Sequence, residues 1–258
     1  MKVVLFAGGL GTRLSEETDI RPKPMVEIGG KPILWHIMKI YSHYGFNDFI
    51  VCLGYKGYFI KEYFMNYFLH NSDITIDLAN NKLEVHGTNA ESIKVTLVET
   101  GLSTKTAGRL KQVQKYIGNE DFMLTYGDGV CDVNLASLLA FHQQHKKIAT
   151  LTSVPMNSRF GGMDLDENGS VMSFREKAKD ESKWINGGFF ILKPEVFNYL
   201  DGDMTDMMWE DEPLEKLTND NQLIAYRHDG FWKCMDALRD KIELEELWVT
   251  NNAKWKVW

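Results

Sequence analysis

The stretch KVVLFAGGLGTRL, residues 2–14, decides the fold, because an apolar run leads directly into a glycine-rich, basic loop. The apolar run predicts a buried strand, and the glycines let the backbone turn sharply and bring its N–H groups close to a ligand. Arg13 and the later Lys23, in the segment Arg21-Pro22-Lys23-Pro24, add fixed positive charge. N–H donors and cations that converge on one loop suit a polyphosphate, so this segment predicts a phosphate-binding loop.

Two common phosphate loops do not match this spacing. The dinucleotide fingerprint needs a third glycine where Leu14 stands, which makes a dehydrogenase a remote alternative. The P-loop closes on Gly-Lys-Ser/Thr, whereas Gly11 is followed by Thr12-Arg13. A plain strand-to-loop connection that uses glycine only for its geometry is the remaining alternative, and the neighbouring cations disfavour it.

Helical and strand patterns alternate after the loop. Apolar spacing predicts helices over 32–44 and 57–69 and a buried strand over 49–53, which together indicate a doubly wound α/β sheet. Residues 73–99 interrupt the alternation with polar–apolar repeats, which predict inserted antiparallel strands suited to subunit contacts, before a core-like strand resumes over 95–99. Ligands bind such sheets at the carboxyl ends of strands, where the opening loop lies.

Composition limits the class of protein. A chain of 258 residues with 44% hydrophobic residues predicts one large domain with a real core. A net charge of −7 argues against nucleic acid, so polyanionic ligands would need a local cluster of cations. We find no stretch long enough to cross a membrane and no signal peptide. Cys52, Cys131 and Cys234 lack metal-binding spacing, so we expect reduced thiols and a cytoplasmic protein.

The opening loop together with RPKPM at 21–25 resembles the signature of the sugar-1-phosphate nucleotidylyltransferase family. Within that family, VEIGGKPILWHIM at 26–38 resembles the members that use CTP, and the likeness covers essentially the whole chain. It implies a Rossmann-like, doubly wound mixed sheet of the glycosyltransferase-A-like type. The expected organisation is a single nucleotidyltransferase domain over 1–258, with a small β insertion at about 73–99 and a helical tail at about 236–258.

The resemblance also implies which residues contact the nucleotide. Arg13 and Lys23 would be catalytic, and Arg109 would help to recognise cytosine at the start of the helix predicted from Thr104. An exposed helix charge is the alternative for Arg109. The implied nucleotide contacts are Phe6, Ala7, Gly8, Gly9, Leu10, Gly11, Thr12, Arg13, Lys23, Thr104, Arg109 and Gly127.

Two aspartates are candidate metal ligands. Asp128 stands between glycines after the buried strand predicted at 122–126, where a turn aspartate is the alternative. Asp236 precedes the helix predicted at 238–248 and could simply cap it. The family resemblance implies that both acids hold Mg²⁺, and two carboxylates with phosphate oxygens and water fit that hard cation.

The sugar side is expected around a hairpin between 160 and 177 and a strand over 184–192. Lys177 could instead be a solvated lysine, and Asn186 a turn residue before two glycines. The resemblance implies sugar-phosphate contacts from Tyr126, Glu176, Lys177, Asn186 and Gly188.

The implied reaction is transfer of a cytidylyl group from CTP to α-D-glucose 1-phosphate. A phosphate nucleophile is already an anion near neutral pH, so no side-chain nucleophile is needed. The alternatives are the same chemistry with another nucleotide or acceptor, and a non-catalytic nucleotide-sugar sensor. The resemblance further implies a homohexamer serving surface polysaccharide synthesis, and Trp248, Trp255 and Trp258 would suit an apolar contact surface.

Overall fold

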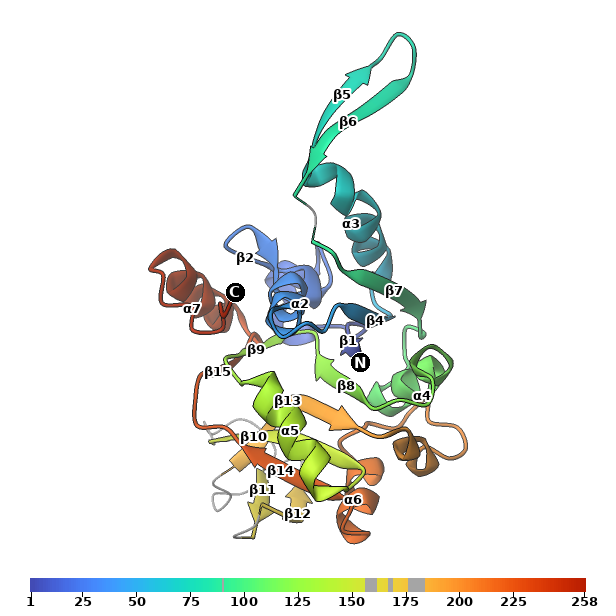
Figure 1. Ribbon diagram of the computed structural model, residues 1–258, viewed down its shortest axis with the longest axis vertical. Helices are drawn as coiled ribbons and strands as arrows, with labels where there is room; N and C mark the ends of the chain where they lie inside the picture. The colour runs from blue at the N-terminus through green and yellow to red at the C-terminus, as the bar shows by residue number, and fades with distance from the viewer. Residues whose placement is uncertain (90, 156–161, 167–168, 176–183) are drawn as a thin grey trace.

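The computed structural model describes residues 1–89, 91–155, 162–166, 169–175 and 184–258. Within these ranges, nine strands form one mixed sheet in the order β12-β11-β13-β8-β1-β4-β7, and β10 pairs with both β13 and β14 (Figure 1). Its strands are β1 Lys2–Phe6, β4 Asp48–Leu53, β7 Lys94–Glu99, β8 Phe122–Tyr126, β10 Ala149–Pro155, β11 Gly162–Leu165, β12 Val171–Arg175, β13 Trp184–Leu192 and β14 Leu223–Arg227. The pairs β8–β1, β1–β4 and β4–β7 are parallel, whereas β13 runs antiparallel to β8.

Helices cover both faces of the sheet. Successive side chains of β1 point to opposite faces and enter two different cores. Val3 and Leu5 belong to a core that includes residues of α2 (Ile33–His43), whereas Val4 and Phe6 belong to a second core with α4 (Thr106–Ile117). The other helices are α1 Ser15–Thr18, α3 Gly57–His70, α5 Leu135–His145, α6 Glu212–Asn219 and α7 Leu238–Val249, with 3-10 turns η1 Thr12–Leu14, η2 Lys23–Met25 and η3 Pro194–Tyr199. The prediction of a doubly wound mixed α/β sheet is confirmed.

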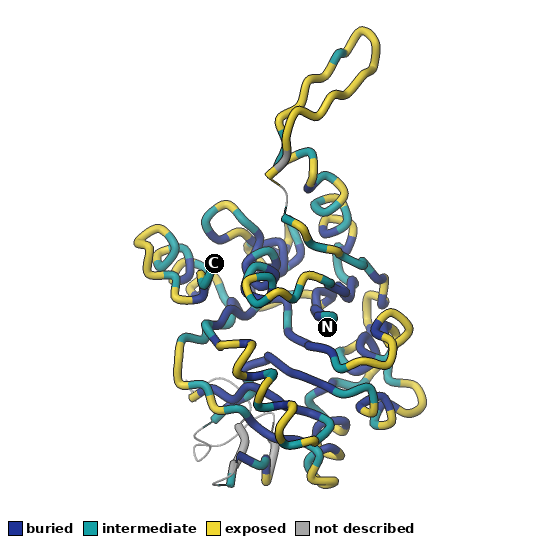
Figure 2. Tube along the Cα trace, in the orientation of Figure 1, coloured by how far each residue is buried: buried dark blue, intermediate teal, exposed yellow. Residues whose placement is uncertain are grey.

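A long β-hairpin leaves the body of the protein after α3. Strands β5 (Ser72–Asp77) and β6 (Lys82–Thr88) pair antiparallel and project away from the sheet, with most of their residues exposed (Figures 1 and 2). The prediction of inserted antiparallel strands is thus confirmed. The segment 73–99 also contains β7, which returns to the main sheet beside β4.

The C-terminal tryptophans pack on their own chain. Trp255 is 1% exposed within the core that includes α2, and Trp248 and Trp258 pack against the same core. Gly29, at a φ of 59°, has no Cβ where the Trp248 indole lies, so the indole reaches the backbone. Trp255 is therefore buried away from any contact surface, whereas Trp248 and Trp258 stay partly exposed and their role in a contact surface remains a prediction.

His36 lies fully buried within this aromatic cluster. Its Nε2–H donates to the Ile28 carbonyl at 2.8 Å, while its Nδ1 faces the indole N–H of Trp255 at 3.4 Å. An indole nitrogen can only donate, so Nδ1 must accept and the ring must be neutral. Burial, chiefly, lowers the pKa of His36 to about 4. The same cause lowers the pKa of His142 and His145 to about 4.

We expect the protein to lose stability as the pH falls from about 6.5 to 4. In this window the unfolded histidines bind protons and the folded ones do not, so His36 alone accounts for a loss of about 3 kcal/mol at most. Denaturant unfolding at a series of pH values measures this loss. His36→Gln should flatten the profile, whereas His43→Gln, at an exposed position, should not. Equal slopes for His36→Gln and the wild type would contradict the argument.

The described part of the hairpin near the sugar side matches its prediction. β11 and β12 pair antiparallel, and β13 covers the predicted strand at 184–192. Most of the expected turn, Glu167 and Asn168, lies outside the described residues, as do Glu176 and Lys177.

Candidate active site

The loop after β1 opens onto a pocket of about 640 Å³ at the carboxyl ends of β1 and β8. Gly11 takes a φ of 67°, which turns the chain into η1 and aims Arg13 at the pocket. All of the residues predicted to contact the nucleotide line this pocket, and Tyr126 and Asp128 line it as well. Their contact with a nucleotide remains a prediction.

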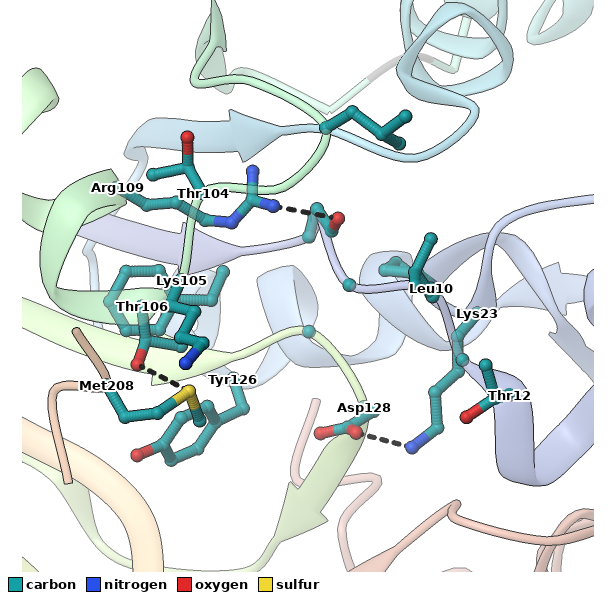
Figure 3. A pocket seen from close by; sticks show the side chains of 18 of the residues that line it. Leu10, Thr12, Lys23, Thr104, Lys105, Thr106, Arg109, Tyr126, Asp128 and Met208 are labelled. Carbon is teal, nitrogen blue, oxygen red and sulfur yellow. Dashed lines mark hydrogen bonds and ion pairs between the residues drawn. The ribbon is translucent and has the colours of Figure 1, made fainter. Parts of the chain in front are cut away.

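Arg109 supports the loop from beneath. Its side chain is nearly buried, at 4% exposed, and its guanidinium donates to the carbonyls of Gly8 and Leu53 and to the Thr100 hydroxyl, at 2.6–3.0 Å. The alternative of an exposed helix charge is therefore wrong. Figure 3 shows this guanidinium at the end of the pocket opposite Lys23, close to Thr104. Three neutral acceptors fix its position, and the remaining N–H donors can face a ligand in the pocket.

Two neighbouring glycines of the loop provide a matched test of this packing. A Cβ on Gly8 would lie 2.1 Å from Nη1 of Arg109, whereas a Cβ on Gly9 would have nothing within 4 Å. We expect Gly8→Ala to lower the free energy of unfolding by about 1–3 kcal/mol, because the buried guanidinium must leave its acceptors. Gly9→Ala should change it by less than about 1 kcal/mol. Equal changes in the free energy of unfolding for the two variants would show that Arg109 can move away from Gly8 without losing stability.

Lys23, Asp128 and Asp236 meet at the other end of the pocket. The Lys23 ammonium lies 2.6 Å from a carboxylate oxygen of each aspartate, and Nη1 of Arg13 lies 2.9 Å from the other oxygen of Asp236. The side chain of Lys23 is 11% exposed, whereas that of Arg13 is 74% exposed. Figure 3 shows the Lys23 ammonium pointing toward the carboxylate of Asp128. The structure therefore brings together two acids that are far apart in the sequence.

A short pair of strands holds the aspartates together. β9 (Gly129–Cys131) begins directly after Asp128, and it pairs antiparallel with β15 (Trp232–Cys234) just before Asp236. The Met235 N–H also donates to the Asp128 carbonyl at 2.8 Å. Asp236 does not cap α7, because the carboxylate of Asp240 accepts the N–H groups of Asp236 and Ala237 at that helix start. The capping alternative is wrong, and the side chain of Asp236 is left to face Lys23.

The electrostatics of this cluster favour a cation. Burial opposes the charge of Lys23, but the carboxylates of Asp128 and Asp236 outweigh it and raise its pKa above the ordinary value. Lys23 therefore stays an ammonium at neutral pH. Two carboxylates that converge on one positive group, beside a pocket with room for phosphate oxygens and water, fit a hard divalent cation.

A second polar network lies between α4 and β13. Tyr126 donates to the carboxylate of Glu210, and the Thr106 hydroxyl donates to the same carboxylate at 2.9 Å. Asn186 lies within β13, with its amide 3.5 Å from the Tyr126 hydroxyl and its side-chain oxygen accepting from Gly188. Asn186 therefore lies in a strand, although its side chain bonds the backbone two residues on, as a turn asparagine does. Burial raises the pKa of both Glu210 and Tyr126.

Sequence reasoning missed part of the pocket. Lys105 and Thr106 adjoin the predicted Thr104 and could have been included on that ground. No sequence pattern marked Glu210 as a pocket residue. The nearby Pro213 indicates only that a helix begins there. The missed lining residues are Pro24, Leu102, Ser103, Lys105, Thr106, Met208 and Glu210.

Comparison with known proteins agrees with this fold and identifies the family. The nucleotidyl transferase family model matches residues 2–242, so the chain belongs to the nucleotidyl transferase family. The chain is 55% identical over 259 residues to a glucose-1-phosphate cytidylyltransferase of Salmonella typhi, covering all of both chains. It is 47% identical over 258 residues to a probable glucose-1-phosphate cytidylyltransferase of Bacillus subtilis, again covering both chains fully.

Solved structures show the same fold. HddC from Yersinia pseudotuberculosis superposes with a TM-score of 0.76 at 25% identity, covering 96% of this chain and 99% of that one. A UDP-glucose pyrophosphorylase in complex with UDP-glucose superposes with a TM-score of 0.77 at 18% identity, covering 97% and 98%. No helix among the described residues has the length and apolarity needed to cross a bilayer.

Proposed function

We propose that this protein transfers a cytidylyl group from CTP to α-D-glucose 1-phosphate, which gives CDP-glucose and pyrophosphate. The observation that carries the proposal is the Lys23 ammonium held between Asp128 and Asp236 at one end of a glycine-rich pocket. Full-length identity of 55% to a glucose-1-phosphate cytidylyltransferase supports the choice of both substrates.

The reaction needs positioning more than it needs a side-chain nucleophile. An oxygen of the sugar phosphate attacks the α-phosphorus of CTP in line, and the bond from that phosphorus to the pyrophosphate oxygen breaks. The attacking group is already an anion, since a phosphate monoester has a second pKa near about 6. Arg13, exposed beside the loop, would neutralise the leaving pyrophosphate, and Lys23 would bridge phosphates at the reacting centre.

Asp128 and Asp236 would hold a divalent cation, which we propose to be Mg²⁺. Such an ion neutralises phosphate charge and orients the α-phosphate. The carboxylates have a second role in the chain itself, because they keep Lys23 charged and fix its ammonium at one position.

The nucleotide base and the sugar would occupy opposite sides of Tyr126. Thr104 and Arg109 lie on the side of α4, where we propose that they contact cytosine. Asn186 and Gly188 lie on β13, where we propose that they contact the sugar phosphate together with Glu176 and Lys177. Glu210 contacts Tyr126 and Thr106 and joins the two sides.

A panel of nucleoside triphosphates and sugar 1-phosphates, assayed for pyrophosphate release with and without Mg²⁺, tests the proposal. We expect CTP with glucose 1-phosphate to be the preferred pair and release to require the cation. Preference for UTP or dTTP would keep the chemistry and reject the cytidylyl assignment. Binding of CDP-glucose without any release would instead support a sensor.

We also propose that the protein is a homo-oligomer, a hexamer by its resemblance to the family. The hairpin supports a contact between copies of the chain, because it projects from the body as an exposed segment (Figure 2) and carries apolar side chains. Ile76, Leu78 and Leu83 are 57%, 88% and 52% exposed. Sedimentation of the wild type and of an Ile76→Ser/Leu83→Ser variant should give a smaller particle for the variant.

We propose that the protein is located in the reducing cytoplasm, which fits the free thiols of Cys52, Cys131 and Cys234.

A further inference from the structure

Cys234 lies directly beside the paired carboxylates. The pairing of β9 with β15 sets Cys234 opposite Gly129, so its thiol lies next to Asp128 and only two residues before Asp236. Its sulfur and one carboxylate oxygen of each aspartate lie within 4.8 Å of one another. The side chain is partly buried and forms no disulfide. A mixed set of one sulfur and two oxygen donors is therefore assembled at the cation end of the pocket.

This donor set differs from the one that Mg²⁺ selects. Mg²⁺ takes oxygen ligands, whereas Zn²⁺ and Cd²⁺ accept cysteine sulfur together with carboxylate oxygen. Zinc bonds of about 2.0–2.3 Å in a tetrahedral site place donors within about 4 Å of one another, so small side-chain rotations bring these three into range.

Lys23 competes for the same position. Its ammonium lies 2.6 Å from an oxygen of both Asp128 and Asp236, so a metal ion bound to these acids must displace it. The affinity of the site for any cation is therefore set by Lys23 as much as by the ligands. Removing that ammonium should strengthen the binding of a metal ion at these acids.

We infer that Cys234, Asp128 and Asp236 form a thiophilic cation site, which takes Zn²⁺ or Cd²⁺ and inhibits the protein when filled. Binding replaces the S–H bond of Cys234 with a metal–sulfur bond and releases the proton to water, with no change of oxidation state. The inhibition rests on the proposed function, because a tightly held soft ion would occupy the place of the exchangeable hard cation. The binding itself does not depend on that function.

Titration of Cd²⁺ into the purified full-length protein, followed by the ultraviolet charge-transfer band of cadmium–thiolate bonds, tests the inference. We expect one equivalent to saturate the band in the wild type. Cys234→Ser should abolish the band and weaken Cd²⁺ binding by about 10- to 100-fold, and Lys23→Met should tighten it. Cys131→Ser is the control for the other group whose spacing could hold a metal ion, Cys131 with Asp132 and His228, and it should keep the band. A band that survives in Cys234→Ser, or that disappears in Cys131→Ser, would overturn the inference.

Cadmium-113 NMR tests the site in the wild-type protein alone, so the result does not depend on whether a variant folds. A resonance shifted into the range of mixed sulfur and oxygen ligation supports the site, and one in the all-oxygen range rejects it. Magnesium-dependent pyrophosphate release from the same preparation separates the two proposals. A cadmium–thiolate band without turnover would reject the proposed function alone, and turnover without the band would reject only the thiophilic site.

Discussion

Lys23→Ala is expected to lower kcat/KM for pyrophosphate release by about 10²–10³-fold while the fold remains intact. The wild-type ammonium is almost fully shielded from solvent, and the carboxylates of Asp128 and Asp236 hold it 2.6 Å from their oxygens. A positive charge beside the substrate phosphates stabilises the charge of the phosphoryl transition state. Alanine removes that charge and leaves the two carboxylates facing each other.

The same substitution has a second expected effect, on stability. Without the ammonium, the close carboxylates repel, so the free energy of unfolding should fall by roughly 1–3 kcal/mol in the absence of divalent cations. Added Mg²⁺ should recover most of that loss, because the cation then takes the position of the ammonium. Denaturant unfolding with Mg²⁺ and with a chelator measures both values.

Lys241→Ala is the matched control for Lys23→Ala. Lys241 forms an ion pair with Glu17 outside the pocket lining, and its side chain is partly buried like that of Lys23. We expect kcat/KM within about threefold of the wild type for this control. A kcat like that of the wild type in Lys23→Ala would refute the catalytic role assigned to Lys23.

The first strand and its loop could be predicted because their conformation depends on neighbouring residues in the sequence. The apolar run of β1 buries on both faces, and the glycines after it need no distant partner to turn the chain. For the same reason, Arg13 and Lys23 were found as cations beside the loop. The alternation of helices and strands that follows predicted the sheet, since each element shows its own period in the sequence.

Features that depend on distant contacts could not be derived from local pattern. The position of Asp236 depends on the pairing of β9 with β15 and on Asp240, which takes over the helix cap. Its local pattern favoured a cap, and only the family resemblance placed it with Asp128. Glu210 is fixed by Tyr126 and Thr106, which lie far away in the sequence. Trp255 packs beside His36 across most of the chain, and no local pattern distinguishes a buried indole in a tail from an exposed one.

Asp128→Asn and Asp236→Asn form the second prediction with a large expected effect. Each substitution keeps the size of the side chain, removes one charge that would bind the cation, and weakens the hold on Lys23. We expect each to lower kcat/KM by about 10²–10³-fold and to raise the Mg²⁺ concentration needed for half-maximal rate. Initial rates of pyrophosphate release over a range of Mg²⁺ concentrations measure both quantities.

The double variant distinguishes a shared site from two independent contributions. Because both carboxylates act on one cation and on the single ammonium of Lys23, either loss already disables the site, so the double variant should cost little more than one single variant. Independent roles would instead multiply the two losses. Asp132→Asn is the control, since Asp132 directly follows β9 and pairs with His228. A loss in Asp132→Asn comparable to that in Asp128→Asn would mean that the charge of the β9 region, and not the bridged pair of aspartates, determines the rate.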